Sequence, residues 1–494
     1  MQQVTSCESI FSHGFHRFSP IKSKIRANTY TCALVQVSVP IRGKKENVRT
    51  FVRTSDLMIE LVNKDYFTPF IASAMEKARC PLPACYDCTT SKKLPARLIF
   101  DLLGMLSSIR FLYRKIYAFL EANPFLGSLF VAFGTLLLYY RTLVREVGWG
   151  DSAELALSAY QLGLTHPPGY PLYTLLGKLV SLFFDDPAVG TNLLSAVCTS
   201  LAIGVMSLVI HQVTRSPLIA IFAPVLFAVL PNIWDMAVVA EVYNVNIFFL
   251  GCSIYFFIRV ERSQFTTFLP SSALFFGLSL GTYQANLLLL PAFLLALLIG
   301  TPRHKLVKNL FVFGSIVSVI WLAFLSYTIL RSYAPVAVGG PLDSVDKILV
   351  YVSGSELRPG FPADIHFYAD RLEAHTSLFS KNFLYLAVPV GLLGALTLFK
   401  SRRNTAIFLA AAFLINFLFF SFYAVSDYFT MPTPSYYIFS IWIGCGLAFL
   451  SRIQPVNEKK PGVGQRRFLY CIGHAAGARS VVGACGTLKH LPGD

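Results

Sequence analysis

The sequence predicts an all-α polytopic membrane protein. Of its 494 residues, 54% are hydrophobic and only 14% are charged, whereas about a quarter of the residues of a soluble domain are charged. Long apolar runs recur from about residue 125 to residue 451, and the lysines and arginines gather in the short loops between them. Helices satisfy their own backbone hydrogen bonds inside a bilayer. Together these observations favour a bundle of membrane-spanning helices.

We expect about ten transmembrane helices, within a range of about nine to twelve. A helix that crosses a bilayer needs about 20 predominantly apolar residues, and several of the apolar runs are shorter than this. The expected spans cover residues 125–144, 189–210, 217–232, 244–259, 269–283, 286–300, 309–330, 381–399, 405–424 and 435–451.

The basic residues indicate which loops face the cytosol. Alternate loops carry Arg215, then Arg259 and Arg262, then residues 303–308, then residues 400–403, whereas the loops between them at 233–243, 284–285 and 425–434 contain no Lys or Arg. Because cytosolic loops are enriched in basic residues, the first set is cytosolic. In a eukaryotic cell the other face is the lumen of the endoplasmic reticulum, so we expect a multi-pass protein of that membrane.

Parity of the crossings constrains two further segments. Residues 269–300 cross twice, in two short passes, because the basic loops on both sides of them are cytosolic. Residues 172–184 are apolar and helical in pattern, but a full crossing there would invert every later loop. We therefore expect this helix on the luminal side, at the interface or re-entrant.

The chain divides into three predicted regions. We expect residues 1–124 to be a cytosolic N-terminal region that is partly disordered or results from a mispredicted gene start. Residues 125–451 form the expected transmembrane domain, and residues 452–494 form a basic cytosolic tail. The formal charge of +16 comes from Lys and Arg that gather in short loops and at both ends, a pattern that orients membrane helices. Without a nucleic-acid-binding motif we expect no nucleic-acid partner. Three cysteines at 80, 85 and 88 lack the paired spacing of a zinc site, so we predict no metal.

The stretch "GDSAELALSAYQLGLTHPPGYPLY", residues 150–173, is the first candidate for chemistry. Asp151 and Glu154 lie three residues apart, so a helix that begins here presents both on one side. Asp151 also has the sequence position of an N-cap, and a turn rich in proline and glycine follows His166. A structural interpretation treats Asp151 as a cap and His166 as a loop residue bonded to its own backbone.

Further polar clusters fall on the same predicted luminal face. They contain Asp235, Glu241, Tyr243, Asn244, Gln284, Glu356, Arg358 and Asp427. Acids beside a membrane span are costly and usually mark a pathway or a reaction. Nucleotide-binding, zinc-protease and serine-hydrolase motifs are absent from the sequence. A proton-coupled transporter would place its acids near the bilayer midplane, whereas the acids here lie at span ends. Residue patterns alone therefore favour a site at the luminal face, and they leave both an enzyme and a transporter open.

The stretch "WGDSAELALSAYQLGLTHPPGYPLYTLLGKL", residues 149–179, resembles the signature of a family of membrane glycosyltransferases with the GT-C fold. Its animal member, transmembrane protein 260, is a protein O-mannosyltransferase that acts on the IPT domains of plexins and related receptors. "AVVAEVYNVN", "GLSLGTYQANLLLLPAFLL" and "PSYYIFSIWIGCGLAF" resemble later blocks of that family in the expected order. The resemblance covers roughly residues 125–450, and the helical-repeat domain of the animal members has no counterpart here.

The resemblance implies a transferase that moves mannose from dolichyl-phosphate mannose to Ser or Thr of secretory or membrane proteins. It would be inverting, and it would use no metal and no cofactor beyond the lipid-linked donor. Asp151 would act as general base and Glu154 would support it. His166 and Arg358, and with less support Arg145, would bind the leaving phosphate. Glu241, Tyr243 and Asn244 would shape the sugar pocket or brace the first loop, and Gln284 would bind substrate. A lipid or solute transporter and an inactive scaffold remain the alternatives.

Overall fold

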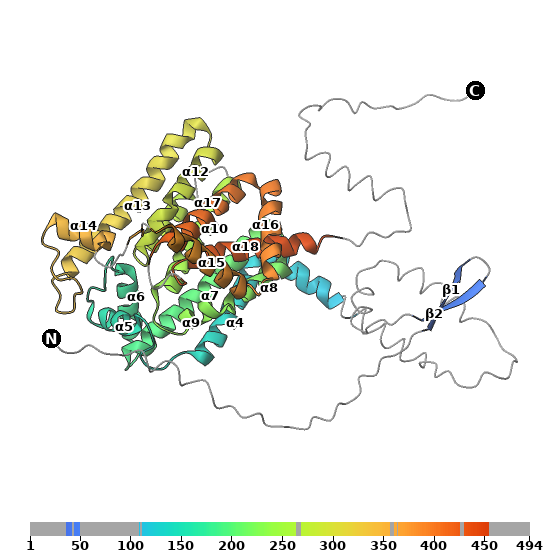
Figure 1. The fold of residues 1–494 in the computed structure, drawn as a ribbon, viewed down its shortest axis with the longest axis horizontal. Coiled ribbons are helices and arrows are strands. Elements are labelled where there is room, and N and C mark those ends of the chain that lie inside the picture. The colour runs from blue at the N-terminus through green and yellow to red at the C-terminus, as the bar shows by residue number, and fades with distance from the viewer. Residues whose placement is uncertain are drawn as a thin grey trace, which may run out of the picture. The chain divides into compact units, whose positions relative to one another are not determined.

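A computed structural model describes most of the predicted membrane domain and one small hairpin before it (Figure 1). Contacts divide the chain into two units, Met1–Pro95 and Ala96–Asp494. The described residues are 36–41, 44–49, 108, 111–262, 268–355, 360–362, 364–424 and 429–453. Most of the predicted N-terminal region and nearly all of the predicted tail, 452–494, therefore lie outside the described residues, as do the three clustered cysteines.

The first unit contributes a two-stranded antiparallel hairpin. Strand β1 (Gln36–Ile41) pairs with β2 (Lys44–Arg49) in a register that runs from Gln36 opposite Arg49 to Ile41 opposite Lys44. The predicted boundary at residue 124 stays a prediction.

The described part of the second unit is helical, apart from one isolated bridge between Leu164 and Ala337. Each of the ten expected spans overlaps a helix of the structure, so the predicted all-α membrane class is confirmed. The helices are α4 (Pro124–Thr142), α5 (Ser152–Gln161), α6 (Pro171–Ser181), α7 (Pro187–Thr214), α8 (Pro217–Ala228), α9 (Pro231–Ala237), α10 (Val242–Arg262), α11 (Leu269–Leu280), η1 (Gln284–Leu289), α12 (Leu290–Gly300), α13 (Arg303–Arg331), α14 (Val345–Ser353), α15 (Ile365–Asn382), α16 (Ala387–Ser401), α17 (Arg403–Phe422) and α18 (Thr433–Leu450).

Six of the described helices are long and apolar enough to cross a membrane by themselves: α4, α7, α10, α13, α17 and α18. Two bent pairs raise the number to eight, because α8 with α9 and α15 with α16 pass the same test together, with bends of 76° and 95°. At 1.5 Å per residue, the 12 residues of α11 span about 18 Å, less than the roughly 30 Å of a hydrocarbon core. The two predicted short passes at 269–300 therefore remain a prediction.

Prolines define where many of these helices begin. Helices α4, α6, α7, α8, α9, α11 and α18 all have Pro at their first or second position. Proline lacks a backbone N–H, which the first turn of a helix does not need, and its fixed φ suits a helix start. The short helix α6 is shorter than a bilayer span, as expected for residues 172–184.

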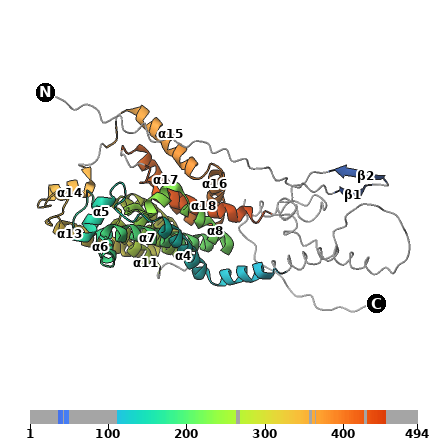
Figure 2. The same ribbon diagram turned by 90° about the horizontal axis from the view of Figure 1, so that it is seen from below.

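Helix α7 lies at the centre of the helical unit and packs against α4, α8 and α10 (Figures 1 and 2). About 72% of its most apolar window is buried, whereas only 11% of the corresponding window of α13 is buried. Small residues such as Ala202 and Gly204 face its neighbours. Small side chains let membrane helices approach closely, so α7 forms the core and α13 leaves most of its surface open to lipid.

The amphipathic helix α15 lies along one side of the helical unit and turns sharply into α16 (Figure 2). Residues 331–380 lie between two of the expected spans, and the structure places both α14 and α15 there. The ring of His375 in α15 bonds the Ser421 hydroxyl of α17 at 2.8 Å. Phe379 and His375 of this polar helix are buried against the bundle, and these contacts stabilise its helical form.

A buried polar network joins α10 to the α11–η1 turn. The Asn286 amide donates to Asn246 Oδ1 at 2.6 Å and to Ser279 Oγ at 2.9 Å. A buried polar group without a partner costs about 1–3 kcal/mol, so these side chains hold the two segments in one register. The network thereby fixes the positions of Tyr243 and Tyr283, whose rings meet edge to face with centroids 5.3 Å apart.

The contact between α16 and α18 generates a first prediction. A Cβ added at Gly394 would lie 1.7 Å from the Trp442 carbonyl oxygen, whereas a Cβ at Gly314 on α13 would meet nothing within 4 Å. Overpacking costs about 1–3 kcal/mol, so Gly394→Ala should lower the thermal midpoint of the purified protein in detergent. Gly314→Ala, the matched control, should leave it unchanged or raise it slightly, since Ala favours helix over Gly. Equal midpoints for the two variants would contradict this packing.

Candidate active site

The first site residue, Asp151, sits at the start of α5 but does not cap it. Its side chain makes no capping hydrogen bond, so the capping interpretation of this acid is wrong. Gly150 precedes it with φ +62°, and a Cβ at that glycine would lie 3.4 Å from Glu241 Oε1. A left-handed conformation suits glycine, and this one brings the Asp151 backbone beside Glu241.

Glu154 holds the loop that follows α5. Its Oε1 accepts a hydrogen bond from the backbone N–H of His166 at 2.5 Å, and both carboxylate oxygens lie 3.1–3.2 Å from His166 Nδ1. Burial alone would raise the pKa of Glu154, but the hydrogen bonds and charge of His166 outweigh burial and hold that pKa below its ordinary value. The interpretation of His166 as a loop residue bonded to its own backbone is therefore wrong.

The other ring nitrogen of His166 faces Tyr170 and Asp151. Nε2 lies 3.0 Å from the Tyr170 hydroxyl and 3.8 Å from Asp151 Oδ2. A carboxylate only accepts hydrogen bonds, so the network assigns a proton to Nδ1. Nε2 and the Tyr170 hydroxyl share the second hydrogen bond of the ring. Burial raises the pKa of Tyr170 well above its ordinary value, which keeps that hydroxyl protonated. Glu154 thus orients the imidazole toward the space beside Asp151.

The loop after α13 braces the same turn from outside. Leu164 and residues 336–338 exchange backbone hydrogen bonds, and the Tyr351 hydroxyl of α14 donates to the Thr165 carbonyl. The Arg331 guanidinium donates to the carbonyls of Leu162 and Gln161 at the end of α5. These contacts join segments about 170 residues apart in the chain, so the His166 turn is fixed from both sides.

Two cavities meet at Asp151. The first, of about 870 Å³, we call the apolar cavity, because α13, α14 and α17 line it mainly with apolar side chains. Asp151, Glu154, His166, Tyr243, Tyr283 and Gln284 form its polar end.

The second cavity, of about 690 Å³, we call the polar cavity. Its lining includes Asn232, Asp235, Glu241, Asn382 and Thr430, together with Trp149 and Phe429. Asp151 and Tyr243 line both cavities. A group bound in one cavity and a group bound in the other would therefore both contact these two side chains.

The structure brings most of the predicted site residues together. Asp151, Glu154, His166, Glu241, Tyr243 and Gln284 all line at least one of the two cavities, and the Gln284 amide also donates to the Val352 carbonyl at 3.2 Å. Arg358 lies outside the described residues. Arg145 lines neither cavity, because its guanidinium covers the ring of Tyr140 and donates to that residue's carbonyl.

We expected Asn244 to shape the sugar pocket or to brace the first loop. It is fully buried, lines neither cavity, and donates from its amide to the Ile233 carbonyl at 3.0 Å. Its neighbour Glu241 is held by its backbone, whose N–H donates to Ser195 Oγ on α7 at 3.1 Å. Asn244 thus braces α9, and through α9 the wall of the polar cavity.

Sequence reasoning missed two aromatic residues of the site. Tyr170 and Tyr283 both line the apolar cavity and are almost fully buried. Each lies inside a stretch that already attracted attention, "HPPGYPLY" and "GTYQAN". A tyrosine within a polar turn beside an apolar span could have indicated these residues. A buried Tyr hydroxyl usually needs a hydrogen-bond partner, so such a tyrosine tends to lie beside other polar groups.

Asp151, Glu154 and His166 could also hold a cation. One ligand atom from each lies within 4.8 Å of the others, and carboxylate and imidazole ligands suit a divalent metal. In the described structure the hydrogen bonds between Glu154 and His166 already use these atoms. Our expectation of no metal stays a prediction.

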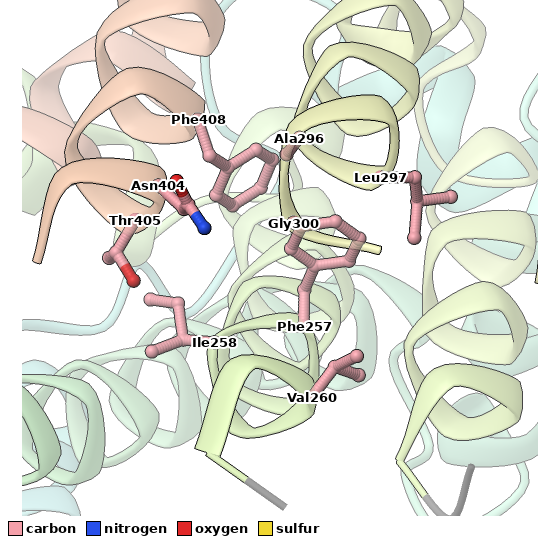
Figure 3. Close-up of a pocket in the computed structure, with 9 residues that line it drawn as sticks. All are labelled: Phe257, Ile258, Val260, Ala296, Leu297, Gly300, Asn404, Thr405 and Phe408. Atoms are coloured by element: carbon pink, nitrogen blue, oxygen red, sulfur yellow. The ribbon is translucent and has the colours of Figure 1, made fainter. Parts of the chain in front are cut away.

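A third cavity is far smaller and lies away from this site (Figure 3). It measures about 30 Å³ and lies between the ends of α10 and α12 and the start of α17. Phe257 in its wall follows Tyr243 by 14 residues on α10, about 21 Å along the helix. Its lining contains no acid or base, so it offers room for a few water molecules and no chemistry.

The Glu154–His166 contact generates a second prediction. Glu154→Ala should increase hydrogen exchange of residues 163–170, with the largest change at the His166 amide, whereas Glu154→Gln should change it less because its side-chain oxygen still accepts. The folded-state pKa of Glu154 is lowered, so its contribution to stability is present above its ordinary value of 4.5 and is lost as pH falls through the lower folded value. Mass spectrometry should show wild-type protection decreasing in that acid range after correction for intrinsic exchange. Unchanged protection in Glu154→Ala would show that other contacts hold the turn.

Comparison with known proteins finds similarity to one family. Residues 151–306 match the N-terminal domain of the protein O-mannosyl-transferase TMEM260 family. The mouse protein O-mannosyl-transferase TMEM260 is 33% identical over 139 residues, which are 28% of this chain and 20% of the mouse protein. Its counterpart from Dictyostelium discoideum is 28% identical over 119 residues, 23% of this chain and 14% of that protein. The alignments thus span a fifth or less of these curated relatives.

Two solved structures of ArnT from Cupriavidus metallidurans were also found, each 14% identical to this chain. The structure bound to undecaprenyl phosphate has a TM-score of 0.48 and covers 70% of this chain and 63% of ArnT. The apo structure has a TM-score of 0.46 and covers 73% of this chain and 63% of ArnT.

The family match begins at Asp151 and includes the His166 turn, Glu241 and Gln284. The resemblance that the sequence motifs carried is therefore confirmed over residues 151–306, the stretch that matches the N-terminal domain of the TMEM260 protein O-mannosyl-transferases.

Proposed function

We propose that this chain is a GT-C-type protein O-mannosyltransferase. It would transfer mannose from dolichyl-phosphate mannose to Ser or Thr of secretory or membrane proteins at the luminal face of the endoplasmic reticulum. The observation that carries the proposal is the meeting of an apolar and a polar cavity at Asp151. A lipid-linked donor and a water-soluble acceptor need two such compartments with one shared reacting point.

The apolar cavity suits the lipid-linked donor. Leu287, Leu288, Trp321, Phe419 and Phe420 line it, and burial of apolar surface contributes about 25 cal/mol per Å². Trp321 comes from α13, the helix with the least buried apolar window among the candidate spans. A prenyl chain would enter along this face, with its phosphate and sugar at the polar end.

The chemistry would be a single displacement. The acceptor hydroxyl oxygen attacks the anomeric carbon, the bond from that carbon to the phosphate oxygen breaks, and the hydroxyl proton moves to the Asp151 carboxylate. A carboxylate is too weak a base to deprotonate an alcohol beforehand, so proton transfer accompanies attack. One displacement inverts the anomeric configuration.

Glu154 and His166 would act on the donor side. Both line the apolar cavity and neither lines the polar one, so they lie where the phosphate would leave. Once protonated, His166 would offer a charge-assisted hydrogen bond to the developing phosphate charge, with Glu154 holding its ring. Among the described residues, the lining of the apolar cavity contains no Lys or Arg. Arg358, four residues after the lining residue Gly354, remains our proposed second cation.

The charge pattern supports a luminal site. Helix α17 begins at Arg403, next to Arg402 and Lys400, and reaches Phe420 in the apolar cavity 17 residues later, about 26 Å along its axis. Helix α10 runs from Tyr243 at the site toward Arg259 at its other end. The basic helix ends thus lie about one bilayer thickness from the site, as expected if they face the cytosol.

The base assignment generates a third prediction. Asp151→Asn should retain the thermal midpoint of the wild type but slow transfer of labelled mannose from the lipid donor to peptide by about 10²–10⁴-fold. Asp185→Asn, an exposed aspartate in the turn before α7, should keep wild-type activity. Full activity in Asp151→Asn would exclude this residue as the base. Solute flux across vesicles without a covalent product would instead favour the transporter alternative.

Metal independence generates a fourth prediction. Treatment with a chelator should leave the rate of mannose transfer unchanged, because Glu154 and His166 already satisfy one another by hydrogen bonds. The measurement is the initial rate before and after exhaustive dialysis against EDTA. Loss of activity that added Mn²⁺ or Mg²⁺ restores would assign a cation to Asp151, Glu154 and His166.

A further inference from the structure

Three carboxyl groups line the polar cavity. Asp151, Asp235 and Glu241 all line it, and its described lining contains no Lys or Arg. A cleft lined by charge of one sign focuses the electrostatic potential and attracts groups of the opposite sign. The acceptor side of the site therefore favours positive charge.

Asp235 is the exposed carboxylate among the lining residues of this cavity. It is exposed on α9 and makes no hydrogen bond or ion pair with any residue that the structure describes. Asp151, by contrast, lies near His166, and Glu241 is almost fully buried. Asp235 is thus the acid whose charge a bound molecule can meet without displacing an existing contact.

Asn232 adds a hydrogen-bonding pair to the same wall. Its side-chain oxygen and nitrogen are both buried, and neither has a hydrogen-bond partner among the described residues. Each unsatisfied group costs about 1–3 kcal/mol, and buried polar atoms normally have a partner. A side-chain amide offers one acceptor and two donors, which complement the N–H and C=O of a polypeptide backbone.

Two exposed aromatic side chains complete the entrance. Trp149 is 54% exposed and Phe429 is 44% exposed, and both line the polar cavity. Exposed aromatic rings supply contact area and attract cations over their faces. Aromatic, acidic and amide groups also bind sugars, but the sugar of a lipid-linked donor has to remain joined to the lipid in the other cavity. The polypeptide is therefore the occupant that these groups fit best here.

We propose that the polar cavity binds an acceptor polypeptide segment in which Lys or Arg flanks the reactive Ser or Thr. Asp235 selects the flanking positive charge, and the Asn232 amide, which is buried in the unliganded structure, turns into the cavity to bind the backbone. This inference rests on the proposed function and deepens it by naming the class of acceptor sequence. Acidic residues beside the hydroxyl are disfavoured, because they would face Asp235 and Glu241 across the cavity.

The test uses the full chain in lipid nanodiscs and two peptides that differ only at the residues beside one Ser, which are Lys in one peptide and Glu in the other. Wild-type kcat/KM should favour the Lys peptide by about two- to fivefold per exposed ion pair, and the preference should shrink as salt rises. Asp235→Asn should reduce the preference, and Asp235→Lys should reverse it. The matched control is Asp185→Lys, which changes an exposed aspartate outside both cavities and should leave the preference unchanged.

Peptide binding to the Asp151→Asn variant separates this inference from the proposed function. Fluorescence anisotropy should show tighter binding of the Lys peptide than of the Glu peptide, and Asn232→Leu in the same background should weaken both peptides to a similar extent. Selective binding without any mannose transfer by the wild type would refute the function and leave the subsite standing. Equal binding and equal use of the two peptides would overturn the subsite. So would a result in which Asp235→Lys changes binding of mannose 1-phosphate but not of peptide.

Discussion

The contact between Glu154 and His166 is the constraint on which the rest of the site depends. One carboxylate binds both the backbone N–H and the ring of the same histidine, so it fixes the chain path and the side chain together. That path sets Tyr170 beside the imidazole and α6 against α5. Without this contact, the buried end of the apolar cavity would lose its polar wall.

The two cavities offer different environments to an apolar and to a polar ligand. A lipid chain is stable against apolar side chains, whereas a polypeptide segment with its hydrogen-bonding groups is stable only where polar partners or water remain. Asp151 and Tyr243 separate the two environments by the thickness of their own side chains. In the proposed function, each substrate would stay in the surroundings that suit it until the reacting atoms meet.

The sequence alone predicted the parts of this structure that depend on local pattern. Each of the ten expected spans overlaps a described helix, and the two acids and the histidine of residues 150–173 line the apolar cavity. The partner of Glu154 could not be predicted, because it lies 12 residues away across a turn whose path depends on bracing by residues 331–351. For the same reason the sequence left open whether Asn244 shapes the pocket or braces a loop. In the structure its amide donates to the Ile233 carbonyl of α9.

The polar helix α15 shows the same limit of prediction from sequence. Its sequence is too polar for an expected membrane span. Its helical form depends on burial of His375 and Phe379 against helices that are distant in the sequence. Such tertiary contacts override local propensity. A single sequence gives no direct sign of them, whereas the proline-marked starts of α6 and α7 follow from local chemistry alone.

The sparse packing of α13 has a consequence for how a lipid substrate would be supplied. This helix buries only 11% of its apolar window and yet contributes Trp321 to the cavity wall. In the proposed function, a prenyl tail would therefore reach the site by lateral diffusion without being extracted into water. Turnover would then respond to the surface density of the carrier in the leaflet rather than to any bulk concentration. The fluidity and crowding of the surrounding bilayer would become part of the enzyme's kinetics.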